Sequence, residues 1–212
     1  MISNTRYSSI VLGSSSPRRK QLISSLSIPF RVISPLINEP EPIIDEFPSA
    51  YCERMALLKS NSIKHLISSS ECLITSDTVV SLGKNILGKP KDPIEAEYML
   101  KMLRGKTHKV LTSVVLFSPF KNKIRKTIKI THVNMRNYSN LEISEYINLG
   151  DCMDKAGSYS IQNEDFKLSQ DIDGCYTSVV GLPLCDVSSM LIRENFNLDE
   201  VICGKGLDKS WL

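Results

Sequence analysis

Near its N-terminus, the chain has a short apolar run that ends at a cluster of small polar residues. Residues 9–14, SIVLGS, are mostly β-branched and aliphatic up to a glycine, a pattern typical of a short buried strand that runs into a turn. Proline suits the first position of a helix, so we predict a helix from Pro17, with Ser15 or Ser16 as its cap. Apolar residues then recur at helical spacing up to Leu26. The pattern therefore predicts a strand–turn–helix unit.

Strands and helices continue to alternate along the rest of the chain. The strongest strand signal is ECLITSDTVVSL, residues 71–82, and residues 86–90 are expected to return as its hairpin partner. Residues 92–105 have the pattern of a helix, with Asp92 as cap, proline in first position and a final glycine. The other predicted elements are strands at 109–118, 124–136 and within 165–174, helices at about 50–65, at 140–150 (capped by Asn140) and at 183–195, and an extended loop at 35–49. Interleaved strands and helices indicate an α/β fold.

The turn between the first strand and the first helix, GSSSPRRKQL, concentrates groups that attract anions. A helix start leaves backbone N–H groups unpaired, serine hydroxyls add donors, and guanidinium groups match the geometry of phosphate. Arg18 and Arg19 therefore make this turn a candidate phosphate site, although it lacks the Gly-Lys-Ser/Thr of a Walker loop. On this pattern alone, a capped helix whose arginines point into water is an equally good interpretation.

A carboxylate interrupts the strongest strand. Asp77 lies within TSDTVV, where an isolated charge is costly to bury unless a metal, a cation or a proton compensates it. One interpretation is a carboxylate that lines a cleft and binds a divalent metal or takes a proton from water. The other is a structural aspartate at a strand end that pairs with a lysine. An acid in the middle of so strong a strand favours the functional interpretation.

Three further polar residues are weaker candidates when each is taken alone. Lys59 lies on the second predicted helix and Lys89 follows the hairpin, and the ammonium group of either could bind a phosphate. A single lysine, however, is more often solvated. In DKAGSYSIQ, residues 154–162, small residues permit close backbone approach, and the Gln162 amide offers a donor and an acceptor to a ring edge. A plain turn with a buried glutamine is the alternative. Together, cations, a carboxylate and an amide suit hydrolysis of a nucleotide phosphate better than acyl transfer.

Composition limits the classes of partner. The 212 residues carry 26 Lys+Arg against 23 Asp+Glu, and the net charge of +3 is too small to indicate nucleic-acid binding but is compatible with an anionic small molecule. No stretch is long and apolar enough to span a bilayer. The 6 cysteines form no C-x-x-C pair, which favours reduced thiols and a cytoplasmic protein. We therefore expect neither a nucleic acid nor a membrane as partner.

Five blocks in a fixed order resemble one family, the Maf proteins, which are nucleoside triphosphate pyrophosphatases. The blocks cover nearly the whole chain and read VLGSSSPRRKQLI, SDTVV, LGKPKDPIEAEYMLKMLRGKTHKV, DKAGSYSIQ and DGCYTSVVGLPL. The resemblance implies an α/β fold of the kind shared with inosine triphosphatases, in which a mixed sheet folds into two lobes around a deep cleft. It also implies that residues 1–212 form a single bilobed domain.

The resemblance further implies a reaction, the hydrolysis of a nucleoside triphosphate between its α and β phosphates, which releases the monophosphate and pyrophosphate. A divalent metal, Mg²⁺ or Mn²⁺, is implied as cofactor, and a homodimer as the assembly. Asp77 matches the family's proton acceptor, which activates water. The implied phosphate-binding residues are Ser16, Arg18, Arg19, Lys59 and Lys89.

The family also implies where the base is distinguished. Arg18, Thr78 and Gln162 match the positions associated with base selectivity. The segments SPRR, SDT and SIQ resemble the branch that acts on dTTP and UTP, whereas the branch that favours 7-methyl-GTP is expected to have glutamine where Thr78 stands. Two alternatives stay open, a 7-methyl-GTP pyrophosphatase of the same family and a non-catalytic nucleotide-binding regulator of cell division.

The chain departs from the family pattern in places. Gly13 stands where the family usually has alanine, and NEDF, residues 163–166, stands where it often has glycines. INEPEP, residues 37–42, matches an acidic stretch of the family loosely, which makes Glu39 a candidate metal contact. Residues 204–212 match no block of the family. The change at 163–166 affects the loop expected next to the base.

Overall fold

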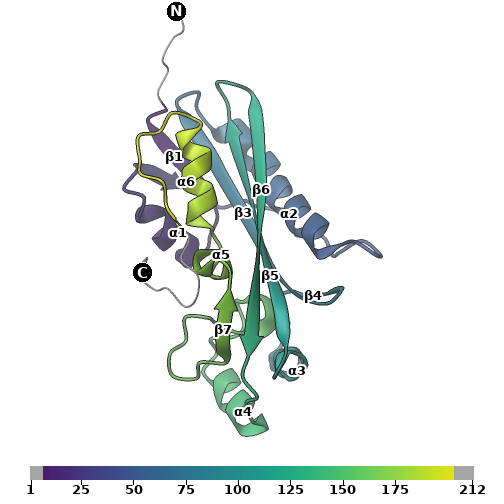
Figure 1. The fold of residues 1–212 in the computed structure, drawn as a ribbon. Helices are drawn as coiled ribbons and strands as arrows, with labels where there is room; N and C mark the ends of the chain where they lie inside the picture. Colours follow the sequence, from purple (N-terminus) through teal and green to yellow (C-terminus); the bar gives the residue numbers. More distant parts are fainter. Residues whose placement is uncertain (1–6, 203–212) are drawn as a thin grey trace, which may run out of the picture.

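The computed structural model of the protein describes residues 7–202, and Figure 1 shows a long twisted sheet with helices against it. The strands are β1 (Ser9–Gly13), β2 (Phe30–Val32), β3 (Glu71–Leu82), β4 (Asn85–Leu87), β5 (Thr107–Ser118), β6 (Lys123–Met135) and β7 (Ser169–Asp173). The helices are α1 (Pro17–Ser24), α2 (Pro48–Ile63), α3 (Pro93–Leu103), α4 (Asn140–Asn148), α5 (Tyr176–Val180) and α6 (Leu184–Ile192), with short 3₁₀ turns at Lys64–Leu66 and Ala156–Ser158.

The strands of residues 7–202 form one mixed sheet. Their order is β2-β1-β3-β5-β6-β7, and β4 pairs with β3. β1 runs parallel to β2 and to β3, whereas the remaining pairs are antiparallel. The long strands β3, β5 and β6 form the centre of the sheet, where each residue of β3 from Leu73 to Ser81 has a partner in β5. The predicted α/β class with a mixed sheet is confirmed.

Helices cover both faces of the sheet. α2 lies against one face, where Ile63 packs with Leu73 and Cys52 packs with Val79. The main core lies on the other face, beneath α1 and α6, which Figure 1 shows on the opposite side of β3 from α2. Its fully buried members include Ile10, Leu22, Leu100, Tyr146 and Leu191. The sheet is therefore enclosed near its centre, and polar side chains on its central strands must find partners there.

Most predicted elements are present with nearly the predicted bounds. Ser16 caps α1 and accepts a hydrogen bond from the N–H of Arg19, as the strand–turn–helix pattern requires. The hairpin of β3 and β4 is confirmed, and Asp92 caps α3. The pattern missed β2 and α5, because elements of 3 and 5 residues are too short for hydrophobic periodicity to reveal.

One predicted helix cap is wrong. Ser139, rather than Asn140, caps α4. The Ser139 hydroxyl accepts from the N–H of Glu142 at 3.1 Å, and the Glu142 carboxylate accepts from the N–H of Ser139 at 2.8 Å. This reciprocal capping box satisfies two backbone donors, which a cap at Asn140 would not do.

The expectation that the cysteines are reduced thiols holds for some of them but not for all. Cys52, Cys72 and Cys152 are free and buried, as predicted. Cys185 is disulfide-bonded, so the expectation of a reduced thiol is wrong there, because spacing along the chain carries no signal for a pairing made by tertiary contacts.

Within residues 7–202, no helix has the length and apolar character needed to cross a membrane. The ends of the predicted domain, 1–6 and 203–212, lie outside the described residues, and its single-domain character stays a prediction.

A gap along one edge of β3 determines where polar groups gather. β1 pairs with β3 as far as Thr75, and β4 pairs with it from Val80 onward. Between them, the edge from Ser76 to Val79 meets neither strand. Because side chains alternate along a strand, Asp77 faces α2 while Thr78 faces α1. The gap gives both side chains access to the same space.

Candidate active site

A cavity of about 620 Å³ opens at this gap in β3. Its walls come from the turn before α1, the loop before α2, α2 itself, β3, the loop after β4, and the segments 154–162 and 179–181. The predicted site residues all line it, namely Ser16, Arg18, Arg19, Lys59, Asp77, Thr78, Lys89 and Gln162. The fold thus brings together residues that are distant in the sequence, while the roles assigned to them stay predictions.

Two carboxylates share one ammonium group in the cavity wall. Nζ of Lys59 forms ion pairs with Oδ1 of Asp77 and, at 2.8 Å, with Oε1 of Glu39. The side chains of Lys59 and Asp77 are only 12% and 8% exposed, whereas that of Glu39 is half-exposed. Glu39 comes from the predicted loop, which Arg54 holds by hydrogen bonds of 2.7 and 2.6 Å to the Glu46 carboxylate. The loop that carries Glu39 is therefore tied to α2 at Arg54 as well as at Lys59.

The two carboxylates differ in their tendency to hold a proton. Burial raises the pKa of Asp77, although the charges of Lys59 and Arg19 oppose the shift. Burial also raises the pKa of Glu39, but the charges of Lys59, Lys89 and Arg19 together outweigh it, and the net pKa is lowered. A carboxylate with a raised pKa is a stronger base than an ordinary aspartate. The lysine that the structural interpretation of Asp77 requires is present, namely Lys59. The ion pair faces a cavity, however, as the functional interpretation requires.

Arg19 is held by three acceptors. Its Nε donates to the carbonyl of Gly181 at 2.8 Å, Nη2 to Oγ1 of Thr78 at 3.1 Å and Nη1 to Oγ of Ser14 at 3.5 Å. Burial lowers the pKa of the guanidinium, but an arginine stays charged at neutral pH. It has five N–H groups, so about two remain for an anion in the cavity. The interpretation in which both arginines simply point into water is therefore wrong.

Arg18 belongs to a second chain of charges. Its Nη1 lies 3.0 Å from Oδ2 of Asp154, and Oδ1 of Asp154 lies 2.7 Å from Nζ of Lys155. Lys155 in turn pairs with Asp151 at 2.8 Å. These ion pairs connect the start of α1 to the segment that ends at Gln162. Residues 154–162 were a candidate part of the site because of their small residues, but the ion pair of Arg18 with Asp154 was not predicted.

The remaining predicted residues lie around the rim of the cavity. Lys89 is exposed in the loop after β4, and its charge contributes to the lowered pKa of Glu39. Gln162 is half-buried, and its backbone N–H donates to Oγ of Ser160 at 3.3 Å. Ser16 combines its capping role with a place in the cavity wall. Cations and an amide thus face the same space from different elements.

Side chains hold the loop after Gln162 in place of the glycines that the family pattern suggests. Nδ2 of Asn163 donates to Asp151 at 3.2 Å, and its Oδ1 accepts from the N–H of Phe166 at 3.0 Å. The Phe166 ring packs edge-on against Tyr146, with 5.4 Å between ring centroids. The departure at 163–166 therefore has its own internal support.

The glycine at position 13 has a steric reason. A Cβ added to Gly13 would lie 2.5 Å from Cγ2 of Thr75 and 2.7 Å from Cδ1 of Ile63. Those distances are shorter than van der Waals contact, so an alanine would require the neighbours to shift. In this chain, the residues packed around the end of β1 fill the space that the family's usual alanine would occupy.

Among the cavity residues that escaped prediction, Ser14, Asp154 and Gly181 contact the two arginines. Ser14 accepts from the N–H of Ser16 at 3.2 Å as well as from Arg19. Gly181 has a φ of 123°, and a Cβ there would lie 3.3 Å from Nε of Arg19. The segment VVGLP contains a signal for a turn, but nothing local indicates that the carbonyl of its glycine faces the first helix.

The donor groups of the cavity suit a hard divalent cation. Mg²⁺ in nucleotide sites is usually held by one or two carboxylates together with substrate phosphates. Asp77 and Glu39 provide two such carboxylates on one wall. In the described part of the chain, no group of three or more His, Cys, Asp or Glu forms a metal cage by itself. The residues therefore fit a cation that binds with a polyphosphate.

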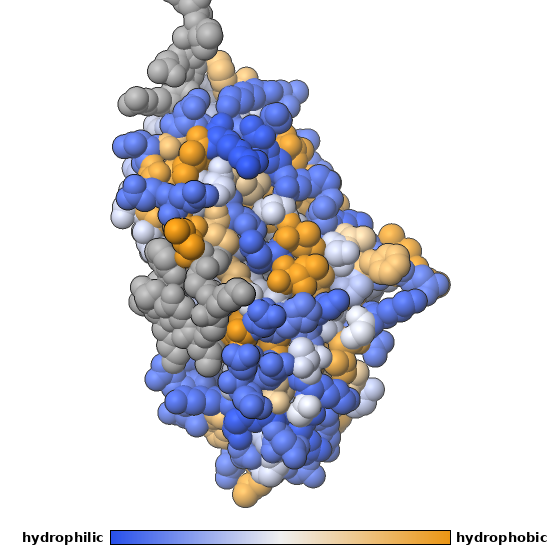
Figure 2. All heavy atoms as spheres, viewed as in Figure 1, coloured by the Kyte–Doolittle hydropathy of each residue, from blue (hydrophilic) through white to orange (hydrophobic). Residues whose placement is uncertain are grey.

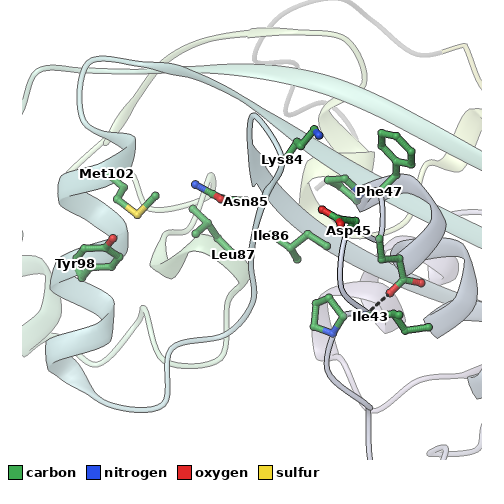
Figure 3. A pocket seen from close by; sticks show the side chains of 12 residues that line it. Ile43, Asp45, Phe47, Lys84, Asn85, Ile86, Leu87, Tyr98 and Met102 are labelled. Carbon is green, nitrogen blue, oxygen red and sulfur yellow. Dashed lines mark hydrogen bonds between the residues drawn. The ribbon is translucent and has the colours of Figure 1, made fainter.

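A second cavity, of about 550 Å³, has a different character. Loop 42–48, β4 and α3 line it, and Figure 3 shows Ile86 and Leu87 between Tyr98 of α3 and Phe47 of the loop. None of the predicted site residues lies in it. The predicted anion-binding residues therefore belong to the first cavity. On the face of the molecule that Figure 2 shows, hydrophobic side chains form separate small patches among hydrophilic ones.

Comparison with known proteins agrees with this fold. The sequence profile described as Maf-like protein matches residues 9–194. A dTTP/UTP pyrophosphatase from Dictyoglomus turgidum is 37% identical over 194 residues, which cover 89% of this chain and 97% of the relative. Proteins of the same name from a Geobacter species and from Clostridium botulinum are 40% identical over 187 residues (88% and 95% covered) and 38% identical over 192 residues (89% and 98% covered). The predicted fold class, an α/β fold with a mixed sheet, is confirmed, and the chain belongs to the Maf family.

Proposed function

We propose that the protein hydrolyses dTTP and UTP, and modified pyrimidine triphosphates of the same class, to the monophosphate and pyrophosphate. The observation that carries the proposal is the single cavity in which a buried carboxylate, several cations and an amide meet. Similarity over nearly the whole chain to relatives named dTTP/UTP pyrophosphatase supports it. Removal of unwanted nucleotides, a house-cleaning role, is the corresponding task in a cell. The homodimer and the cytoplasmic location stay predictions.

The polyphosphate end of the substrate is proposed to bind at the start of α1. Backbone N–H groups there carry positive partial charge, and Ser16 adds a hydroxyl. Arg19 offers the N–H groups that its protein partners leave, and Arg18 lies next to it. Lys59 and Lys89 add charge from other walls of the cavity. Cations on several sides suit the dispersed charge of a triphosphate.

Asp77 is proposed to act as the general base. Its carboxylate takes a proton from the water that attacks the α–β phosphate linkage, the P–O bond of that linkage breaks, and pyrophosphate leaves. The raised pKa suits this role, because a carboxylate with a stronger hold on protons removes one from water more readily. Lys59 holds the carboxylate in a fixed orientation through its ion pair with Oδ1, which leaves Oδ2 for the water.

A divalent cation, Mg²⁺ or Mn²⁺, is proposed to be held by Glu39 and Asp77 together with phosphate oxygens of the substrate. When bound, such a cation neutralises charge that develops on the phosphate oxygens. Glu39 keeps the negative charge of an ordinary glutamate at neutral pH, because the charges of Lys59, Lys89 and Arg19 offset the effect of burial on its pKa, so a carboxylate is available for a cation across the physiological range.

The base is proposed to lie toward Gln162, with Arg18 and Thr78 as the other residues that affect selectivity. An amide presents both a donor and an acceptor, which complements the carbonyl and N–H edge of a pyrimidine. Threonine at position 78, in place of the glutamine expected for the 7-methyl-GTP branch, favours dTTP and UTP as substrates.

The proposal is tested by the nature of the substrate and of the products. The purified protein is incubated with dTTP, UTP and 7-methyl-GTP in Mg²⁺ or Mn²⁺, and pyrophosphate and monophosphate are measured. We expect equal amounts of both products from dTTP and UTP, slower release from 7-methyl-GTP by about tenfold or more, and no release with EDTA. Release of orthophosphate, or no turnover of any nucleotide, would contradict the proposal. Binding without turnover would favour the nucleotide-binding regulator.

A further inference from the structure

A chain of hydrogen bonds runs from the cavity into the core of the sheet. Nη2 of Arg19 donates to Oγ1 of Thr78 at 3.1 Å, and Oγ1 of Thr78 lies 3.0 Å from Oγ1 of Thr112. Thr112 in turn donates to the carbonyl of Ser178 at 2.7 Å. Thr78 and Thr112 are direct cross-strand partners in β3 and β5, and Thr112 is fully buried. Thr112 does not line the cavity and took no part in the proposed reaction.

The order of donors and acceptors in this chain follows from the number of protons. A threonine hydroxyl has one proton and two lone pairs. The carbonyl of Ser178 can only accept, so the proton of Thr112 points to it. The proton between the two threonines therefore belongs to Thr78. Since the guanidinium of Arg19 can only donate, Thr78 must receive that hydrogen bond through a lone pair.

The ordered hydroxyls leave Thr78 without a proton to offer to a ligand. Its hydroxyl donates inward and accepts from Arg19, so it acts toward the cavity as an acceptor alone. The Nε of Arg19 is fixed at the same time by the carbonyl of Gly181. Together these acceptors set the plane of the guanidinium and the direction of its remaining N–H groups.

We propose that Thr112 is a positioning residue, which orients the Thr78 hydroxyl as an acceptor and thereby fixes Arg19 for the polyphosphate. The inference rests on the proposed function, because it takes the anion at Arg19 to be the polyphosphate of the substrate. It implies that Thr78 affects substrate choice through Arg19, rather than by donation of a hydrogen bond to the base. A buried residue of β5 then controls a group that contacts the substrate.

The test is a double-mutant cycle between Thr112 and Thr78. Thr112→Val removes the hydroxyl at nearly constant volume and is expected to lower kcat/KM for dTTP about tenfold, whereas Thr112→Ser keeps the hydroxyl and stays within about twofold of the wild type. In a Thr78→Val background, Thr112→Val is expected to change kcat/KM less than about twofold, because the hydroxyl that it orients is gone. Thr112→Ala serves as a second hydroxyl-free variant if the valine variant does not fold.

Thr75→Val is the matched control. Thr75 is a fully buried threonine of β3, the strand of Thr78, and like Thr112 it donates to a helix carbonyl, that of Ala56 at 2.8 Å, but on the face away from Arg19. The control is expected to lose thermal stability about as Thr112→Val does, with kcat/KM unchanged. Additive effects of Thr112→Val and Thr78→Val, or equal losses in Thr112→Val and Thr112→Ser, would overturn the inference.

Binding of inorganic tripolyphosphate, measured by titration calorimetry, separates this inference from the proposed function. We expect Thr112→Val to weaken this binding about tenfold in the wild-type background and less than about twofold in the Thr78→Val background. If no nucleotide is cleaved but this pattern is found, the proposed function fails and the positioning role stands. If nucleotides are cleaved but tripolyphosphate binding does not respond, or if none is bound, the positioning role fails.

Discussion

The ammonium group of Lys59 forms an ion pair with the carboxylate of Asp77 at a place where both side chains are almost enclosed. A buried ion pair is costly to form unless further polar groups support it, and removal of one partner leaves an uncompensated charge. Here Glu39 joins the pair from an adjacent loop, and a cavity lined by further cations opens beside it. The arrangement is better explained by chemistry in the cavity than by a gain in stability.

Replacement of Asp77 by asparagine is expected to stop turnover while leaving the shape of the site intact. The amide has nearly the same size but cannot take a proton from water, so kcat should fall by about 10²–10⁴-fold. The affinity for dTTP, measured by calorimetry with EDTA so that neither metal binding nor turnover contributes, should change little, because the arginines and lysines stay in place. A variant with undiminished kcat would show that another group acts as the base.

Replacement of Lys59 by glutamine is expected to move the acid limb of the pH–rate profile to higher pH. Lys59 lowers the pKa of Asp77 against the effect of burial, so its loss raises that pKa further. A base with a higher pKa stays protonated up to a higher pH, and kcat/KM then falls at pH values where the wild type is still active. The check is kcat/KM for dTTP from pH 5 to 9. An unchanged acid limb would mean that Asp77 is not the group that titrates.

The sequence predicts the elements whose signals are local. The apolar run before Pro17, the alternation in β6 and the cap at Asp92 depend on neighbouring residues, and each marks an element that is present. The strand β2 and the helix α5 could not be found in this way, because they are short and because β2 forms through contact with β1 and α5 through contact with β5 and β6. Tertiary contact supplies what these segments lack in local preference.

The site was predicted as a set of residues, but its geometry was not. Motif resemblance named Asp77 and Arg19, and both line the cavity. The ion pair of Arg18 with Asp154 spans 136 positions, and the bond of Arg19 to Gly181 spans 162. Such contacts depend on which strands pair and where the pairing stops, as at the gap after Thr75. Strand order is not readable from local patterns.

Replacement of Gly181 by alanine is expected to reduce activity through Arg19. The added Cβ would lie 3.3 Å from Nε of Arg19 and 3.5 Å from Oγ1 of Thr78, and the φ of 123° is one that alanine rarely adopts. We expect kcat/KM for dTTP to fall about tenfold or more, since the guanidinium must move from its present place. Kinetics of the purified variant provide the measurement.

The control for backbone strain is Gly150→Ala. Gly150 also has a positive φ, of 73°, but apart from its own atoms and its two chain neighbours, no heavy atom of residues 7–202 lies within 4 Å of the position of its Cβ. This variant should lose stability through strain and keep its kcat/KM. Equal losses of activity in the two variants would attribute the effect at position 181 to general destabilisation rather than to the displacement of Arg19.

Replacement of Glu71 by glutamine is expected to destabilise the protein at neutral pH but not in acid. Glu71 of β3 accepts two hydrogen bonds, of 2.7 and 2.8 Å, from Arg31 of β2, across the intervening strand β1. These bonds to Arg31 lower the pKa of Glu71 from 4.5 to about 2 in the folded protein, although burial opposes the shift. The folded state therefore binds fewer protons than the unfolded state between these values, and the stabilisation is present above pH 4.5 and is lost as the pH falls toward 2. The melting temperature of Glu71→Gln should be about 5 °C below that of the wild type at pH 7, and the difference should shrink progressively below pH 4.5.

The matched control for this prediction is Glu97→Gln. Glu97 pairs with Lys101 on the surface of α3 at 2.6 Å, with both side chains more than two-fifths exposed, and water screens such a pair. Its melting temperature should stay within about 1 °C of the wild type at every pH, because exposed pairs contribute little. A difference for Glu71→Gln that persists undiminished at pH 3 would mean that the loss arises from altered packing at the edge of β3. A difference that closes with acid, seen only for Glu71→Gln, assigns it to the carboxylate that joins β2 and β3 across β1.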